Sequence, residues 1–94
     1  MTALVSLDGV LRTEVGDPIH EGLKLYRVLV NSYRVVLATD GTKAEAEHWL
    51  RANMLTGYAD IMDNTLAYAG QDLRYRQLQL CRSSGLVELF VDSD

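Results

Sequence analysis

Residues Tyr33 to Asp40 read Y-R-V-V-L-A-T-D, an apolar and β-branched block that stops at two polar residues. A block of this length and composition predicts a buried strand, because a buried helix needs roughly 10 residues or more. The sequence on either side has a different period. Apolar residues recur at helical spacing from Ile19 to Val30, and again from Ala46 to Met54. The block therefore predicts a strand between two helices, which is the repeating unit of a parallel sheet.

Further apolar segments extend this alternation along the chain. Ala3–Leu7 (A-L-V-S-L) and Leu86–Val91 (L-V-E-L-F-V) predict a first and a last strand, and Ala59–Met62 (A-D-I-M) predicts a short third one. Gln71–Ser83 has helical spacing. Strands that alternate with helices require right-handed crossovers between parallel strands. We therefore expect one α/β domain over residues 1–94, with a small doubly wound parallel sheet of four strands.

The helices carry recognisable start signals. Asp17 precedes Pro18 and is predicted to cap the first helix. Thr42, followed three residues later by Glu45, predicts a capping box at the start of the second helix. The residues expected to face inward from the second and third helices are Ala46, Trp49, Leu50, Met54, Leu73, Leu78 and either Leu80 or Cys81.

The composition excludes several classes of function. Nine basic residues against thirteen acidic ones give a net charge of -4, which argues against binding to nucleic acid. No apolar run approaches the roughly 18 residues that a membrane span needs, and Met1–Leu4 has no basic signal-peptide region. The single cysteine, Cys81, excludes an internal disulfide and a cysteine-based zinc site. We expect an acidic cytoplasmic domain, and its seven arginines against two lysines are typical of a GC-rich bacterial or viral genome.

Polar residues stand where several predicted strands end. Ser6 and Asp8 follow the first strand, Thr39 the second, and Asp92 and Asp94 the last. Ligands of parallel α/β sheets bind outside the carboxyl ends of the strands. A single Asp at such a place is more often part of a turn. Several carboxylates along one rim, however, attract a hard divalent cation, which prefers oxygen ligands.

Three of these strand ends resemble the motifs of the haloacid dehalogenase-like (HAD) phosphohydrolases. Leu4–Leu11 (L-V-S-L-D-G-V-L) is similar to the family's first motif, an apolar strand ending D-x-D-G-[TV]-[LV]. Val35–Asp40 (V-V-L-A-T-D) is similar to its strand ending in Thr or Ser, and Glu88–Asp94 (E-L-F-V-D-S-D) to its strand ending in paired acids. The resemblance covers nearly the whole chain. It implies a capless Rossmann-like core with strand order 4-1-2-3.

The resemblance also implies roles for individual residues. The implied site consists of Ser6 at the nucleophile position, Asp8 as general acid/base and metal ligand, Thr39 and Arg74 (runner-up Arg76) on the phosphate, and Asp92 and Asp94 on Mg²⁺.

Ser6 is the main departure from the family, whose nucleophile and metal ligand at this position is an Asp. A serine hydroxyl needs a neighbouring base before it can attack phosphorus. Loss of the carboxylate also weakens Mg²⁺ binding, so any metal site is weak or vestigial. We therefore expect a degenerate domain without phosphatase activity that acts in binding or assembly. The alternative is a Mg²⁺-dependent phosphomonoester hydrolase that uses Asp8 and the acids after the last strand.

The second departure is the length of the chain. The family's core continues past the paired acids into a helix and a fifth strand, whereas this sequence ends at Asp94. Leu86–Val91 should then form an exposed edge strand, which invites strand addition or dimerisation. We expect either a fragment of a longer protein or a domain whose edge is covered by a protein partner or a second copy. A small phosphorylated molecule is a further candidate ligand.

Overall fold

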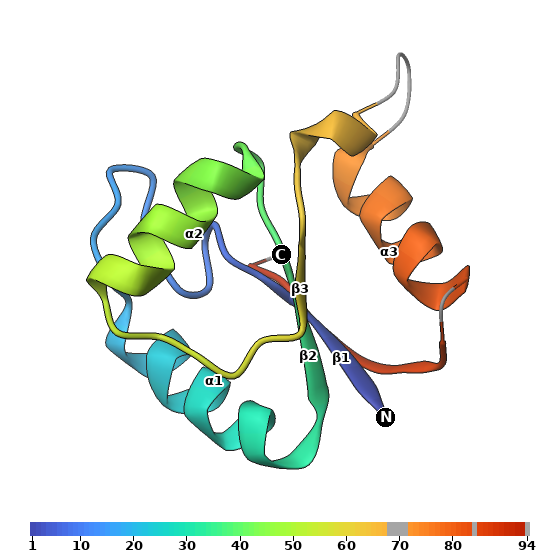
Figure 1. The fold of residues 1–94 in the computed structure, drawn as a ribbon, viewed down its shortest axis with the longest axis horizontal. Coiled ribbons are helices and arrows are strands. Elements are labelled where there is room, and N and C mark those ends of the chain that lie inside the picture. The colour runs from blue at the N-terminus through green and yellow to red at the C-terminus, as the bar shows by residue number, and fades with distance from the viewer. Residues whose placement is uncertain (68–71, 84, 94) are drawn as a thin grey trace.

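The predicted strands form one all-parallel sheet in the computed structural model, which describes residues 1–67, 72–83 and 85–93 (Figure 1). The elements in chain order are β1 (Thr2–Ser6), α1 (His20–Ser32), β2 (Arg34–Ala38), α2 (Lys43–Ala52), β3 (Asp60–Met62), the short 3-10 helix η1 (Asn64–Leu66), α3 (Leu73–Ser83) and β4 (Val87–Val91). The strands lie in the order β3-β2-β1-β4, which confirms the predicted α/β class and strand order.

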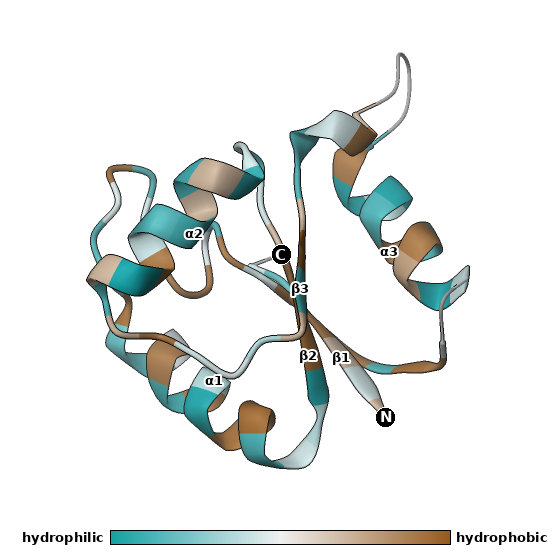
Figure 2. Cartoon of the chain, in the orientation of Figure 1, coloured by the Kyte–Doolittle hydropathy of each residue, from teal (hydrophilic) through white to brown (hydrophobic). Residues whose placement is uncertain are grey.

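The sheet is covered on both faces, with α1 and α2 on one side and α3 on the other (Figure 1). All five residues of β1 are buried, as are four of the five in β2. Alternate strand residues point to opposite faces, so Val5 and Leu37 join the larger core under α1 and α2, while Leu4 and Val36 join a smaller core under α3. The strands are accordingly mostly apolar, whereas the helices alternate apolar and polar residues (Figure 2).

The first helix begins differently from the prediction. The residue before α1 is Ile19, with no side-chain cap, so the prediction that Asp17 caps this helix was wrong. Asp17 instead closes a small loop with Thr13: its backbone N–H donates to Thr13 Oγ1 (3.1 Å), and its carbonyl accepts from the Thr13 N–H (2.8 Å).

The cap of the second helix is confirmed in part. Thr42 Oγ1 accepts a hydrogen bond from the backbone N–H of Glu45 at 3.2 Å. The Glu45 carboxylate does not return to Thr42, as a full capping box requires, but forms an ion pair with Arg12. Arg12 is therefore the partner of the Glu45 carboxylate, in place of the Thr42 backbone N–H that a capping box requires.

One inward-facing prediction was wrong, and it concerns the C-terminal turn of α2. Met54 is 87% exposed because it is in the left-handed conformation (φ 56°) that ends α2. Leu55 takes the inward place, and its N–H donates back to the Leu50 carbonyl at 2.9 Å. In α3, Leu80 is exposed and Cys81 is buried, so the second of the two alternatives is correct.

β4 is an edge strand and pairs with β1. Its ladder shifts by one residue, because Thr2 is opposite Val87 whereas Ala3 is opposite Leu89. The extra residue, Glu88, is exposed, and a bulge that carries a charge is a common protection of an edge against unwanted pairing. Phe90 remains 38% exposed. In the part of the chain that the structure describes, no helix is long and apolar enough to cross a membrane.

Candidate functional site

The loop after β1 brings Asp8 and Arg12 together. The backbone N–H groups of Leu11 and Arg12 both donate to the Leu7 carbonyl, at 3.0 and 3.1 Å. Gly9 permits the sharp turn through its positive φ of 89°, and its N–H donates to the Arg12 carbonyl at 2.9 Å. The turn places the Arg12 guanidinium on the Asp8 carboxylate, with Nε 2.8 Å from Oδ1.

The other oxygen of Asp8 contacts the carboxyl end of β2. Asp8 Oδ2 accepts hydrogen bonds from the Thr39 hydroxyl at 2.9 Å and from the backbone N–H of Asp40 at 2.8 Å. The predicted site residues Asp8 and Thr39 are thus in direct contact. Both oxygens of Asp8 already have partners within the chain.

Arg12 is the centre of a second set of contacts and was missed by the sequence reasoning. Its side chain is only 8% exposed. It forms a two-pronged ion pair with Glu45, with Nη–Oε distances of 2.6 and 2.7 Å, and lies 5.5 Å from the centroid of the Trp49 ring. The i,i+4 spacing of Asp8 and Arg12 was an available signal. Nothing local connects Arg12 to Glu45, 33 residues away.

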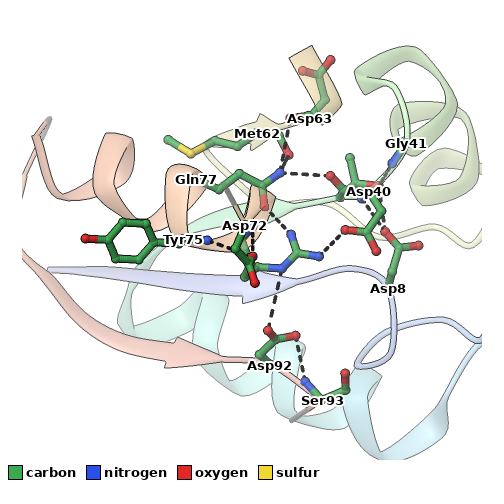
Figure 3. Close-up of polar contacts among 12 residues, drawn as sticks. Asp8, Asp40, Gly41, Met62, Asp63, Asp72, Tyr75, Gln77, Asp92 and Ser93 are labelled. Carbon is green, nitrogen blue, oxygen red and sulfur yellow. Dashed lines mark hydrogen bonds and ion pairs between the residues drawn. The ribbon is translucent and has the colours of Figure 1, made fainter. Parts of the chain in front are cut away.

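Arg74 contacts the other half of the site, where Asp40, Gln77 and Asp92 lie (Figure 3). Its guanidinium lies 2.6 Å from the Asp40 carboxylate and 3.8 Å from that of Asp92, and it also donates to the side-chain oxygen of Gln77. Arg74, the first choice of the two predicted arginines, therefore contacts two acids at the carboxyl edge of the sheet.

Gln77 holds α3 against the ends of β2 and β3. It is fully buried, and its amide nitrogen lies 3.0 Å from the carbonyls of Thr39 and Met62 and 3.3 Å from that of Asp63 (Figure 3). The helical pattern gave no hint of this residue, since a buried glutamine looks like any polar surface position until its partners are known.

Ser6 lies at the carboxyl end of β1 but takes no part in these contacts. It is 0% exposed, and its hydroxyl has no hydrogen-bond partner among the described residues. It pairs with Ala38 across the ladder, whose side chain belongs to the core under α3. Asp94, the second predicted metal ligand after β4, lies outside the described residues.

A hollow of about 460 Å³ opens beside this network. Its walls are the loop at residues 13–16 together with Asp8, Arg12, Glu45 and Trp49. The Trp49 ring nitrogen donates to the Gly16 carbonyl at 2.8 Å, which fixes one wall. Trp49 also packs in the larger core, as predicted.

The residues present do not fit a magnesium site well. Within residues 1–67, 72–83 and 85–93, no three His, Cys, Asp or Glu side chains form a group that could hold a metal ion. Asp8 and Asp92, the two described residues among the predicted ligands, each face an arginine. Each of these two acids thus already has a cationic partner within the chain.

Comparisons of the chain with protein-family models, with curated proteins and with solved structures found no match. The resemblance to HAD phosphohydrolases therefore depends on the three sequence motifs alone.

The environment of Asp8 lowers the pKa of its carboxyl below the ordinary value of 3.8. Burial, the largest single influence, would raise this pKa. The hydrogen bonds from the Asp40 N–H, the Arg12 guanidinium and the Thr39 hydroxyl outweigh it, because they stabilise the charged form. The stability that ionised Asp8 contributes is complete above the unfolded-state pKa and is lost as the pH falls through the lower folded-state pKa.

We therefore expect Asp8→Asn to reduce the free energy of unfolding most near neutral pH. The difference from the wild type should shrink below about pH 4, where the wild-type carboxyl begins to be protonated in the unfolded state. Urea unfolding at about pH 7 and about pH 3 measures both differences. Asp17→Asn, at an exposed position in the loop that follows, is the matched control. A difference for Asp8→Asn that does not vary with pH would contradict this account.

Proposed function

We propose that this chain is a HAD-like domain that does not hydrolyse phosphate esters and acts as a binding or assembly module. The observation that carries the proposal is the identity and the burial of Ser6. The residue at the nucleophile position is a serine that is fully buried. No described residue forms a hydrogen bond with its hydroxyl.

A serine at this position would need a base in order to attack phosphorus. Both histidines of the chain, His20 and His48, lie on helices and are exposed. Asp8 is held by Arg12 and by the end of β2, and its lowered pKa opposes the protonated form that a general acid requires. No described residue is therefore hydrogen-bonded to the Ser6 hydroxyl as a base, and Asp8 is disfavoured as a general acid.

Two features support a role in binding or assembly. Arg74 lies at the carboxyl edge of the sheet, where parallel α/β folds bind ligands, and would offer a small phosphorylated molecule a cationic partner, whereas Thr39 is fully buried there. β4 leaves one edge of the sheet open, with Phe90 partly exposed. A protein partner or a second copy of the chain would cover this edge beyond the bulge at Glu88. Sedimentation equilibrium distinguishes the two, because only self-association raises the mass above 10.5 kDa.

The proposal predicts no phosphatase activity. We expect the purified protein to release no more phosphate from an aryl phosphate and a panel of phosphomonoesters, with Mg²⁺ present, than its Asp8→Asn and Ser6→Ala variants do. Loss of a nucleophile that acts within a concerted site costs about 10⁴-fold or more in rate, so true turnover would stand well above this background. Turnover that Asp8→Asn abolishes would overturn the proposal and favour the Mg²⁺-dependent hydrolase.

A further inference from the structure

Each described acid of the site at the carboxyl edge of the sheet forms an ion pair with an arginine of the same chain. Arg12 contacts Asp8 and Glu45, while Arg74 contacts Asp40 and Asp92. Four carboxylates thus share two guanidinium groups. The two arginine side chains distinguish this site from a cluster of acids without cationic partners, which would bind a divalent ion from solution.

We propose that Arg12 is the permanent counter-ion of Asp8 and that its guanidinium excludes divalent cations from this edge of the sheet. The inference rests on the proposed function, because it concerns the same site. It explains how Asp8 and Asp92 can lie at this edge of the sheet without a bound metal ion, since each is paired with an arginine. The Arg12 side chain cannot release the site by losing its proton, since a guanidinium stays charged at accessible pH.

Three anchors hold the Arg12 guanidinium in place. Glu45 binds it through both oxygens at 2.6 and 2.7 Å, a fork-to-fork geometry that fixes direction as well as distance. Asp8 binds Nε at 2.8 Å. The Trp49 ring covers one side at 5.5 Å from its centroid, an attractive contact for a cation. With only 8% of the side chain exposed, Arg12 has little room to swing away.

A magnesium ion at Asp8 would have to displace these contacts. Mg²⁺ demands near-ideal octahedral oxygen ligands and gives up its water reluctantly. Asp8 Oδ1 faces Arg12, and Oδ2 accepts from Thr39 and the Asp40 backbone. An ion bound to either oxygen would lie near a fixed positive charge. Even with water-like screening, that repulsion lowers the affinity by about tenfold.

Terbium luminescence tests this directly, because Trp49 is the only tryptophan of the chain and lines the same hollow as Asp8. Tb³⁺ that binds beside Asp8 would be sensitised by Trp49, and Mg²⁺ would compete for the site. We expect the wild type and Asp8→Asn to give the same weak emission. Arg12→Met, of similar length but uncharged, should bind Tb³⁺ at least about tenfold more tightly, and a second change, Asp8→Asn, should remove this gain.

Arg51→Met is the matched control, because Arg51 is an exposed arginine in the last turn of α2. Its terbium titration should equal that of the wild type. Near-ultraviolet circular dichroism checks that Arg12→Met is folded. If it is not, the comparison of the wild type with Asp8→Asn still decides the question, because sensitised emission that depends on Asp8 in the wild type overturns the inference. Equal terbium affinity of folded Arg12→Met and the wild type overturns it as well.

The failure of this inference differs from the failure of the proposed function. Metal binding that depends on Asp8, without turnover of phosphomonoesters, contradicts the role of Arg12 alone. Turnover that depends on Asp8, without terbium or magnesium binding, contradicts the proposed function alone.

Discussion

Replacing Gly22 by alanine is expected to destabilise the fold by about 3 kcal/mol, although alanine is the better helix former. Gly22 lies in α1 and is buried against the loop that follows β1. A Cβ atom at this position would be 1.7 Å from the Val10 carbonyl oxygen and 2.7 Å from the Val10 carbonyl carbon. Both atoms belong to the backbone, so no side-chain rotation relieves the clash. Either α1 or the loop that carries Asp8 and Arg12 must move.

Urea unfolding of Gly22→Ala against the wild type measures this loss. Gly85→Ala is the matched control, because a Cβ atom there meets nothing within 4 Å, and we expect it to be neutral or slightly stabilising. If the two alanine variants were equally stable, α1 would not pack on the loop as described. The same contact predicts that Gly22→Ala also disturbs the Asp8–Arg12 pair, which the near-ultraviolet signal of Trp49 would report.

Replacing Gln77 by leucine is expected to cost about 2–4 kcal/mol of stability. The amide of Gln77 is the donor to the carbonyls of Thr39, Met62 and Asp63 at the carboxyl ends of β2 and β3. Leucine is similar in size and apolar, so it removes the Gln77 donor from all three carbonyls. The Met62 and Asp63 carbonyls keep the backbone N–H groups of Thr39 and Leu66, but the buried Thr39 carbonyl loses its described donor. The cost of an unmade hydrogen bond in a buried place exceeds the benefit of the added apolar surface.

Gln79→Leu provides the comparison for Gln77→Leu within the same helix. Gln79 is exposed, and its amide donates to Tyr75 Oη at 3.2 Å, so we expect a change within about 0.5 kcal/mol. Chemical denaturation of both variants gives the two differences. Equal losses would mean that Gln77 does not hold α3 to the strand ends. A large loss for Gln77→Leu alone would support this role. The same substitution removes the side-chain oxygen that accepts a hydrogen bond from the Arg74 guanidinium.

Gly22 and Gln77 show that helices on both faces of the sheet contribute to the site. Gly22 lets α1 press on the loop that presents Asp8 and Arg12. Gln77 fixes α3, which presents Arg74 to Asp40 and Asp92. The ion pairs between the four carboxylates and the two arginines therefore depend on close packing on both faces of the sheet.

The order of the strands was implied by the resemblance to HAD phosphohydrolases, whereas the amino-acid sequence by itself determined the class of the fold and the position of its candidate ligand edge. These properties follow from short-range patterns: the apolar block at Arg34–Ala38, the helical spacing on either side of it, and the Thr42 cap. Each acts over a few neighbouring residues, so it can be read without knowing where the chain folds back. Ser6, Asp8 and Thr39 came to the same edge for this reason, because parallel strands end together.

Only the tertiary structure decided which charges meet. Arg12 and Glu45 are 33 residues apart, and Arg74 and Asp40 are 34 apart. Their pairing depends on the turn after β1 and on the way α3 lies across the sheet. The same holds for Gln77, whose burial depends on carbonyl groups of two other elements. Partners so distant along the chain leave no periodic trace in the sequence, because the contact exists only once the packed elements bring them within a few ångströms.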